Sequence, residues 1–158
     1  MIRTAVLADF PAIFEIAKQV QDIHHGARPD VFREEYFGED IEACLKWEEE
    51  NLDDNHMRTF VCEKNDKIIG FVVAEIYCWV DHPNHNDMAI CRITNFCVDK
   101  SERNKGVGQM LFDHVKSYAK ENGTERLELT VWNFNEDARR FYERQGLSVR
   151  TMTMDMKI

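Results

Sequence analysis

Apolar residues recur along this chain with two different periods, and the helical period is clearest after Gly106. Over residues 107–119 they fall three or four positions apart, which predicts an amphipathic helix. The Asn122-Gly123 pair provides a stop signal at its end. The residues before Gly106 form an apolar strand and a short polar turn, so a strand, a turn and a glycine-opened helix follow one another here.

The first half of the chain carries two weaker helical patterns. One begins at Asp9, a residue type suited to an N-cap, and its apolar face runs to Val20. Between about residues 21 and 38 the period is lost, which predicts an ordered loop. The acidic stretch 39–55 follows, and its glutamates at 48–50 fit a solvated helix face better than a site that attracts cations. The narrow apolar stripe of that stretch consists of Ile41, Cys44, Leu45 and Leu52.

Period-two alternation and long apolar runs predict the strands. A polar turn at residues 65–67 joins two of them into a hairpin. Near the C-terminus the apolar residues occupy odd positions before Arg150 and even positions after it. This change of phase predicts a bulge or break between two strand pieces. A short helix over 135–145 is stopped by Gly146. The expected strands are residues 2–6, 58–63, 68–80, 88–98, 125–132 and the C-terminal pieces that hold Leu147, Val149, Met152, Met154, Met156 and Ile158.

The elements therefore follow the order β-α-α-β-β-β-α-β-α-β. This order predicts an α/β (α+β) fold, a mixed and mainly antiparallel twisted sheet with helices on both faces. One parallel pair of strands is expected, where the chain crosses over through the glycine-opened helix. The length of 158 residues suits one domain over residues 1–158.

Composition narrows the class of protein. The hydrophobic content of 44% and the charged content of 31% are those of a soluble globular protein. A net charge of −9 argues against a nucleic-acid partner, because affinity for a polyanion depends on a basic surface, and it is compatible with a cationic acceptor. Because there is no signal region and no run long enough to span a bilayer, we expect no membrane contact and a cytoplasmic location. The five cysteines lack paired spacing and fit reduced thiols.

The turn that opens the glycine helix carries the strongest chemical signal. Gly106 and Gly108 leave the first-turn N–H groups open to a bulky anion, and the helix dipole adds roughly half a positive charge there. Arg103 and Lys105 add full charges, which favours a diphosphate. A P-loop is excluded because Gly-Lys-Ser/Thr is missing, and a dinucleotide fingerprint is excluded because Leu111 replaces its third Gly or Ala.

The turn matches the pattern Arg/Gln-x-x-Gly-x-Gly/Ala, directly after an apolar strand. A second segment, residues 131–147, follows in the same strand-then-helix setting and contains Asn-x-x-Ala-x-x-x-Tyr. With both segments the chain resembles the GCN5-related N-acetyltransferase (GNAT) superfamily, most strongly from about Ile90 onward. The resemblance implies an N-acetyltransferase that uses acetyl-CoA as co-substrate. It also implies that the two strands flanking the crossover splay apart and admit the pantetheine arm.

The resemblance assigns coenzyme contacts to matching positions. Backbone groups of Phe96, Cys97 and Val98 would hydrogen-bond the pantetheine and the acetyl carbonyl. Asn135 would contact the coenzyme arm, with Asn133 as a second candidate. The pyrophosphate would lie on the turn made of Arg103, Asn104, Lys105, Gly106, Val107 and Gly108.

The acid has a matching residue, but the base does not. Tyr142 matches the family's usual proton donor to the departing sulfur, although a tyrosine on the buried face of a short helix has the same pattern. Many relatives place a carboxylate base on the central strand, where residues 94–96 here are Thr, Asn and Phe. Glu75, which interrupts an apolar strand, is our first candidate for the base. His24, His25 and a water chain to the backbone are the alternatives.

These residues together predict direct acetyl transfer from acetyl-CoA to a primary amine of a small molecule or protein, in a ternary complex. A non-catalytic acyl-CoA-binding or sensing module on the same fold is the alternative, and the carboxylate-free central strand favours it. The failed fingerprints disfavour another nucleotide-binding protein. No metal is expected, because a Pro- and Asn-rich hairpin loop accounts for His82 and His85. A homodimer is common for this kind of fold, and the Met-rich last strand could form one.

Overall fold

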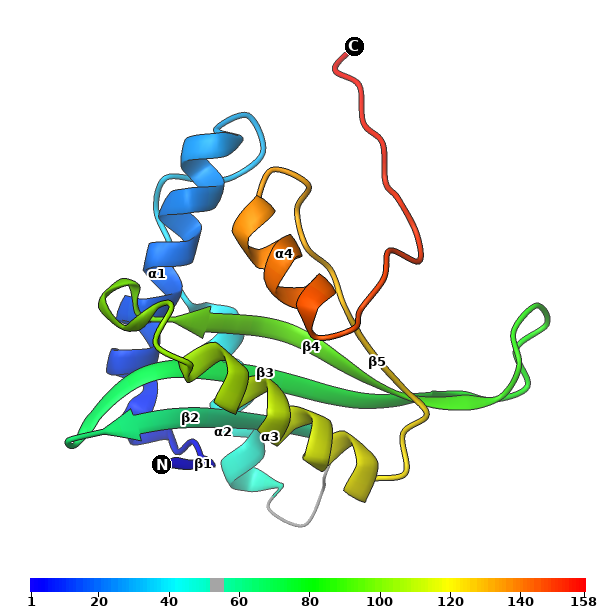
Figure 1. Ribbon diagram of the computed structural model, residues 1–158, viewed down its shortest axis with the longest axis horizontal. Coiled ribbons are helices and arrows are strands. Elements are labelled where there is room, and N and C mark those ends of the chain that lie inside the picture. The colour runs from blue at the N-terminus through cyan, green and yellow to red at the C-terminus, as the bar shows by residue number, and fades with distance from the viewer. Residues whose placement is uncertain (52–55) are drawn as a thin grey trace.

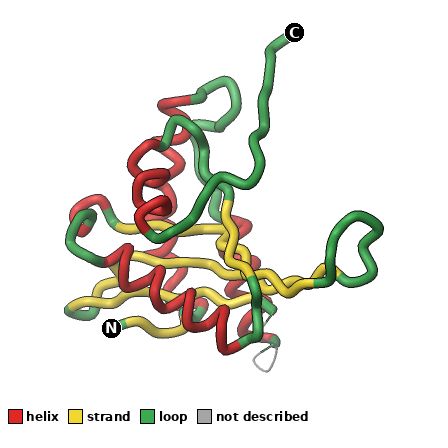
Figure 2. The backbone as a smooth tube through the Cα atoms, turned by 45° about the vertical axis from the view of Figure 1, so that its right-hand side comes forward, coloured by secondary structure: helices red, strands yellow, loops and turns green. Residues whose placement is uncertain are grey.

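The computed structural model describes residues 1–51 and 56–158, and its centre is a five-stranded sheet (Figures 1 and 2). The strands lie in the order β1-β2-β3-β4-β5. Neighbours pair antiparallel except β4 and β5, which run parallel. The predicted mixed, mainly antiparallel sheet is therefore confirmed. The strands are β1 (Ile2–Thr4), β2 (Met57–Lys64), β3 (Lys67–Trp79), β4 (Met88–Val98) and β5 (Arg126–Leu129).

Helices cover both faces of this sheet, as the order of elements predicts. Helices α1 (Phe10–Ala27) and α2 (Glu39–Glu50) lie on one face, and α3 (Val107–Glu121) lies on the other (Figure 1). Helix α4 (Glu136–Arg144) packs on the α3 side through its aromatic residues. The α3 helix connects the parallel strands β4 and β5, so the expected crossover is confirmed.

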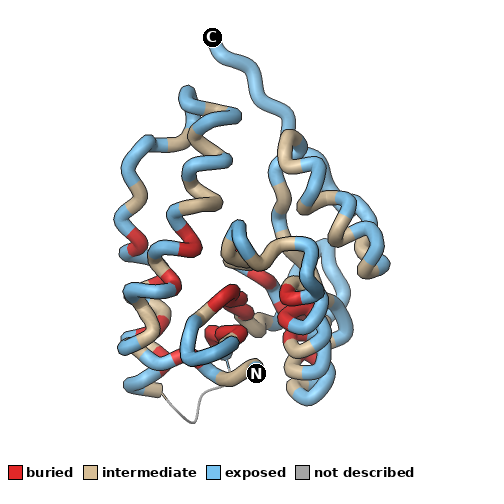
Figure 3. The backbone as a smooth tube through the Cα atoms, turned by 60° about the vertical axis from the view of Figure 1, so that its left-hand side comes forward, coloured by how far each residue is buried: buried red, intermediate tan, exposed pale blue. Residues whose placement is uncertain are grey.

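The sheet separates two apolar cores, which lie between the helical layers (Figure 3). Side chains of β3 alternate between them, because successive residues of a strand point to opposite faces. Phe71 and Val73 pack toward α1 and α2, whereas Val72 and Ala74 pack toward α3. Being covered on both faces, β3 needs a continuous apolar run rather than simple alternation.

Helix α1 is longer than its apolar pattern predicts. It continues to Ala27 and includes His24 and His25, which we expected in a loop. Its last turns extend beyond the edge of the sheet (Figure 1), so they have no core to face and show no apolar period. The predicted loop is therefore shorter, and it begins at Arg28.

The expected C-terminal strand is not formed, and β5 is shorter than predicted. Residues 147–158 have no regular secondary structure and run away from the sheet (Figure 1). An alternating pattern by itself does not make a strand, because a strand needs a neighbour for its backbone hydrogen bonds. Leu52 of the predicted apolar stripe lies outside the described residues.

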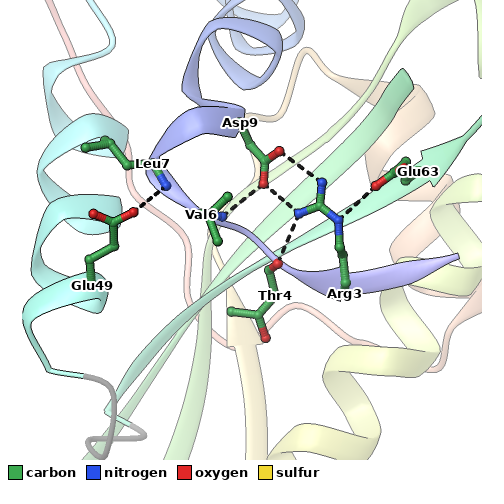
Figure 4. Close-up of polar contacts among 7 residues, drawn as sticks. All are labelled: Arg3, Thr4, Val6, Leu7, Asp9, Glu49 and Glu63. Carbon is green, nitrogen blue, oxygen red and sulfur yellow. Dashed lines mark hydrogen bonds and ion pairs between the residues drawn. The ribbon is translucent and has the colours of Figure 1, made fainter. Parts of the chain in front are cut away.

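Asp9 occupies the predicted N-cap position of α1, but its side chain makes no capping hydrogen bond to that helix. Its carboxylate accepts hydrogen bonds from the Arg3 guanidinium (2.6 and 2.9 Å) and from the backbone N–H of Val6 (2.9 Å), as Figure 4 shows. Arg3 also donates to Glu63 at 2.8 Å. The hydrogen bonds from Arg3 lower the pKa of Asp9. This cluster ties β1 to the start of α1 and to the end of β2, while Glu49 of α2 accepts the N–H of Leu7 (2.9 Å).

The acidic run of α2 is not uniformly solvated, which corrects our interpretation of residues 48–50. Ile41, Leu45 and Glu48 follow the i, i+4, i+7 spacing of one helix face, and all three are buried. The Glu48 carboxylate accepts hydrogen bonds from the backbone N–H (2.9 Å) and the hydroxyl (2.6 Å) of Thr59 on β2. Burial raises the pKa of Glu48. Glu48 therefore joins α2 to the sheet.

We predict that Glu48→Ala lowers the free energy of unfolding by about 2–4 kcal/mol, because it leaves two buried donors of Thr59 unpaired. Exposed Glu50 provides the control, and Glu50→Ala should change this free energy by less than about 0.5 kcal/mol. Urea unfolding measures both variants. Equal effects of the two substitutions would contradict the structural role of Glu48.

Glu48 should also make the free energy of unfolding depend on pH. Because the folded-state pKa of Glu48 is raised above its ordinary value of 4.5, the folded protein holds the ionised carboxylate at a cost at neutral pH. The contribution of Glu48 becomes more favourable as pH falls through the raised pKa toward 4.5. The stability gap between the wild-type protein and Glu48→Ala should therefore widen on acidification.

Candidate functional site

The candidate site begins where β4 parts from β5. Pairing between these strands ends at Ile93 and Leu129. On its other side β4 contains a bulge, because Val73 pairs with Asn95 and Ala74 with Ile93, which leaves Thr94 as an extra residue. A bulge bends and twists its strand locally. Among the described residues, the stretch 94–98 therefore continues without a partner strand on the β5 side.

The turn between β4 and α3 contains two residues with left-handed backbone. Asn104 has a φ of 61° and Gly106 a φ of 86°, so left-handed residues alternate with others along the turn. Left-handed residues that alternate with others can present successive N–H groups to an anion, and we call this turn the N–H nest. Gln19 of α1 fixes the start of the turn, because its side chain donates to Asp99 (2.9 Å) and accepts the N–H of Lys100 (2.8 Å).

The charged residues of the turn are partly occupied within the protein. The Arg103 Nε donates to the carbonyl of Val98 at 3.0 Å, which anchors the guanidinium to the end of β4. The Lys105 ammonium pairs with Glu102 at 3.3 Å, and Lys64 pairs with the same carboxylate at 3.1 Å. The side-chain charges of Arg103 and Lys105 are therefore less available to an anion than the sequence predicts. Backbone N–H groups and the start of α3 remain as the other groups of the turn that suit an anion.

Gly70, but not Gly108, limits how closely a helix approaches the sheet. A Cβ on Gly70 would lie only 3.0 Å from the Cys97 carbonyl and 3.2 Å from Val107, so glycine lets the first turn of α3 rest on β3 and β4. A Cβ on Gly108 would lie 3.5 Å from the Phe141 ring, an ordinary contact. Val107 buries its side chain in the core, so only its backbone faces the turn.

Aromatic packing brings the two sequence motifs together. The Phe96 ring on β4 lies 5.7 Å from Phe141 and 6.0 Å from Tyr142, both on α4. Because Gly108 also lies against Phe141 and Phe96, the start of α3 and the face of α4 meet at the unpaired end of β4. The sequence-predicted residues of both motifs thus belong to one region.

Tyr142 is half-buried and keeps its proton. Burial raises the pKa of its phenol, and the nearby Cys97 thiol adds to this effect. None of the described residues hydrogen-bonds the hydroxyl, which leaves its proton available to a ligand.

Cys97 is a core residue by its side chain. Its thiol packs among the residues under α1 and α2, and burial raises its pKa to about 12. A thiol of this kind is not ionised near neutral pH and does not act as a nucleophile. Only the backbone of Cys97 suits the predicted contact role.

Asn135 has a structural role that the sequence did not indicate. Its side-chain oxygen accepts the N–H of Ala138 at 3.2 Å and so caps α4. Its amide NH₂ group is the part that suits a ligand contact. The oxygen of Asn133 is occupied by Arg139 at 2.7 Å.

Glu75 lies on the α1 and α2 side of the sheet, two residues beyond the core residue Val73. It faces Arg92 of β4 and His56, each 3.8 Å from its carboxylate. Arg92 also binds Glu128 of β5 at 3.0 Å, and the Tyr77 hydroxyl donates to the same carboxylate at 2.6 Å. This polar network, which sequence reasoning missed, crosses three strands at the beginning of the splay. Its only signal in the sequence is the charged residues within apolar strands.

A cluster of rings joins the end of α1 to the connection between β5 and α4. His24 lies 4.8 Å from Phe32 and 5.7 Å from Phe134, and Trp132 lies 4.9 Å from Phe32. Burial lowers the pKa of His24. The ring of the neighbouring His25 makes a hydrogen bond with the carbonyl of Phe32 at 2.9 Å. The two histidines that are alternatives for the base therefore differ, because His24 packs among rings and His25 is hydrogen-bonded.

Tyr36 is a further residue that the sequence did not single out. Its hydroxyl is buried without a hydrogen-bond partner, and its ring stacks on Phe14 at 5.4 Å. Burial raises the pKa of Tyr36, with smaller contributions from Asp40 and Cys97. It comes from the segment between α1 and α2.

The hairpin loop after β3 has an aromatic rather than a ligating arrangement. His85 stacks on Trp79 at 4.1 Å and lies 4.3 Å from His82. Within residues 1–51 and 56–158, no group of three or more His, Cys, Asp or Glu side chains could hold a metal ion. Nor does any helix in these ranges have the length and apolar character needed to cross a membrane.

Comparison with known proteins identifies a related family. The family model described as the acetyltransferase (GNAT) family matches residues 17–147. An uncharacterized N-acetyltransferase of Methanocaldococcus jannaschii is 36% identical over 87 residues, which cover 55% of this chain. The match spans only 37% of that relative's length.

Solved structures share the whole fold. A tetramutant of the BH1408 protein from Bacillus halodurans superposes with a TM-score of 0.91 at 26% identity, covering 100% of this chain and 99% of that one. Glucosamine-6-phosphate N-acetyltransferase from Arabidopsis thaliana has a TM-score of 0.71 at 18% identity, over 99% of this chain and 97% of that protein. The second likeness concerns the fold alone.

Proposed function

This chain belongs to the GNAT family of acetyltransferases, and we propose that it transfers an acetyl group from acetyl-CoA directly to a primary amine. The observation that carries this proposal is the meeting of the two motifs at the unpaired end of β4. The acceptor is a small molecule or a protein amino group. The free thiols of all five cysteines support a reducing, cytoplasmic location.

The residues present fit the coenzyme. The N–H nest of residues 103–106 and the start of α3 suit a diphosphate, and the backbone of 95–98 offers hydrogen bonds to an extended amide-bearing arm. Acetyl-CoA supplies an activated thioester. The turn would hold the diphosphate, and the β4 backbone would orient the thioester and polarise its carbonyl.

The two faces of the sheet suit a ternary complex. Tyr142 packs on the α3 side, whereas Glu75 lies on the α1 and α2 side. An incoming amine must contact the thioester carbonyl, so an acid and a base from opposite faces can act together only through the gap where β4 and β5 are unpaired. Direct transfer is also supported by the protonated state of the buried Cys97 thiol, because this thiol offers no thiolate for a covalent intermediate.

Tyr142 serves the departing sulfur. Because its pKa is raised above that of an ordinary thiol, near 8.5, complete proton transfer to a thiolate is uphill. Its main contribution is therefore a hydrogen bond that strengthens as negative charge develops on sulfur, with the proton moving in concert. Glu75 accepts the proton of the incoming ammonium group, of which only about one in a few thousand is neutral at pH 7.

The first experiment is calorimetric titration with acetyl-CoA, with NADH and ATP as controls. We expect selective micromolar binding to the wild-type protein. Gly108→Asp should abolish it, because a carboxylate would face the diphosphate, whereas Gly108→Ala should retain it, since its Cβ makes only ordinary contacts. Equal binding of NADH, or unchanged binding by Gly108→Asp, would contradict the placement. Binding without turnover of any amine would favour the non-catalytic module.

Tyr142→Phe should lower kcat by about 10²-fold, as expected for loss of a proton donor. The ring is retained, so the affinity for acetyl-CoA should change little. Tyr118→Phe, which removes a hydroxyl near Phe60 and away from α4, is the matched control. Steady-state thiol release measures both variants, and full activity of Tyr142→Phe would assign the donor role to another group.

Glu75→Gln should lower turnover at neutral pH, because the amine must then lose its proton without help. Its deficit relative to the wild-type protein should shrink as pH rises toward the amine pKa, near 10.4 for an alkyl amine. A pH series of kcat/KM measures this trend, with the exposed Glu125→Gln as control. A deficit that is absent, or the same at every pH, would direct attention to His24.

A further inference from the structure

The Tyr36 hydroxyl is a buried donor to which the proposed reaction has not yet given a role. Its oxygen is shielded from solvent and has no hydrogen-bond partner among the described residues. The other shielded oxygen without a hydrogen bond, the Oε2 of Glu128, lies 2.8 Å from the Arg150 guanidinium and is paired electrostatically. Water satisfies a phenol in the unfolded chain, so burial without a partner costs free energy. Such a group calls for an explanation, and a ligand that accepts its hydrogen bond is one.

Tyr36 is held in place by α1 and by the start of α2. Its ring stacks on Phe14 of α1, with the ring centroids 5.4 Å apart. Two residues later, Gly38 begins the turn into α2 with a φ of 67°. A Cβ on Gly38 would lie 2.7 Å from the Phe14 ring, so glycine permits both this backbone conformation and the close approach to α1. The ring stack and the tight turn together limit the freedom of the phenol before any ligand binds.

The phenol lies beside the unpaired end of β4. Tyr36 packs on the core cluster that contains Cys97, and Cys97 belongs to the stretch of β4 without a partner strand on the β5 side. Tyr142 packs on the core cluster of the opposite face. Cys97 nevertheless contributes to raising the pKa of both phenols, so each lies within electrostatic range of this one residue. Two phenols thus approach the same stretch of β4 from opposite faces, where the backbone would orient the thioester.

The protonation state of the phenol limits what it can bind. Burial raises the pKa of Tyr36, with a smaller contribution from Asp40, so near neutral pH the hydroxyl is a donor and not a base. An amine that attacks a thioester needs its lone pair for the new bond, so donation to that nitrogen would be unproductive. The departing sulfur is served by Tyr142. The carbonyl oxygen, which gains negative charge during the transfer, is the remaining acceptor.

We propose that the Tyr36 hydroxyl donates a hydrogen bond to the carbonyl oxygen of the bound thioester. This role rests on the proposed acetyl transfer and adds a side-chain donor to the β4 backbone. As the amine nitrogen bonds to the carbonyl carbon, the π electrons of the C=O bond pass to oxygen, and they return when the C–S bond breaks. Tyr36 keeps its proton throughout. Its hydrogen bond is strongest while the oxygen carries negative charge, so it favours the transition state over the bound substrate.

The same role explains why this position holds a hydroxyl that lowers stability. Phenylalanine would keep the stack on Phe14 without burying an unpaired donor. In the free protein tyrosine is therefore the less favourable residue at position 36. Its donor is satisfied once a thioester carbonyl lies beside it. Sites that need such preorganised groups commonly give up stability for activity.

Isotope-edited infrared spectroscopy of bound acetyl-CoA tests the contact directly. A hydrogen bond to a carbonyl weakens the C=O bond and lowers its stretching frequency. With acetyl-CoA labelled with ¹³C at the carbonyl and no amine present, the frequency should be higher in Tyr36→Phe than in the wild-type protein. Tyr118→Phe, which alters a ring beside Phe60, is the matched control and should give the wild-type frequency.

Equal frequencies in the wild-type protein and Tyr36→Phe, with acetyl-CoA bound to both, would overturn the carbonyl contact and leave the proposed function intact. Calorimetry under the same conditions confirms that each variant is loaded. A wild-type protein that does not bind acetyl-CoA would overturn the proposed function and this inference together. The two failures are therefore distinguishable.

Kinetics and stability provide the second test. Tyr36→Phe should lower kcat by about 10²-fold, the loss expected for one donor to the carbonyl oxygen, with little change in the KM of the amine. Its midpoint of urea unfolding should be equal to that of the wild-type protein or higher. A raised KM with unchanged kcat would place the hydroxyl against the amine. Unchanged kinetics with raised stability would leave the hydroxyl without a role in the reaction. Either outcome would refute the proposal.

Discussion

The separation of β4 from β5 is the constraint on which the candidate site depends. The extra residue Thr94 bends β4 where its pairing with β5 ends, so the strand continues without a partner strand on one side, where Arg103 binds the carbonyl of Val98. Inside a sheet the backbone groups on that side would be hydrogen-bonded, and free ones need another partner. A ligand with amide groups can take that place. Beside the gap, the Phe141 ring of α4 contacts Phe96 of β4 and Phe112 of α3.

The surroundings of this gap divide the chemistry between the two faces of the sheet. Toward α3 lie the N–H nest and Tyr142, which suit a diphosphate and a leaving thiolate. Toward α1 and α2 lie Glu75 and its network with Arg92, which suit a proton-accepting and charge-selecting environment. An acceptor amine must contact the thioester of the donor, so groups from the two faces can act together only at the gap where β4 and β5 are unpaired.

Several of the acidic residues that give the chain its negative charge have partners within the fold. Glu48 is an internal tie between α2 and β2, and Asp9 is a tie between β1 and α1, so neither contributes a free negative charge to the surface. Glu128 compensates two arginines beside the splay. Several acidic residues therefore stabilise the scaffold, and the net charge of −9 is a poor guide to the acceptor by itself.

Local patterns determined much of this protein. The glycine-opened helix, the hairpin, the crossover and the relation of the two motifs follow from periodicity and spacing, because each depends on residues close in sequence. Other features depend on contacts between distant residues, and only the tertiary structure decided them. The bulge at Thr94 needs the register with β3, the role of Glu48 needs Thr59, and the extension of α1 needs the sheet edge it passes. The C-terminal segment, residues 147–158, shows the same limit, since its alternation predicts a strand but a strand forms only where a neighbouring strand pairs with it.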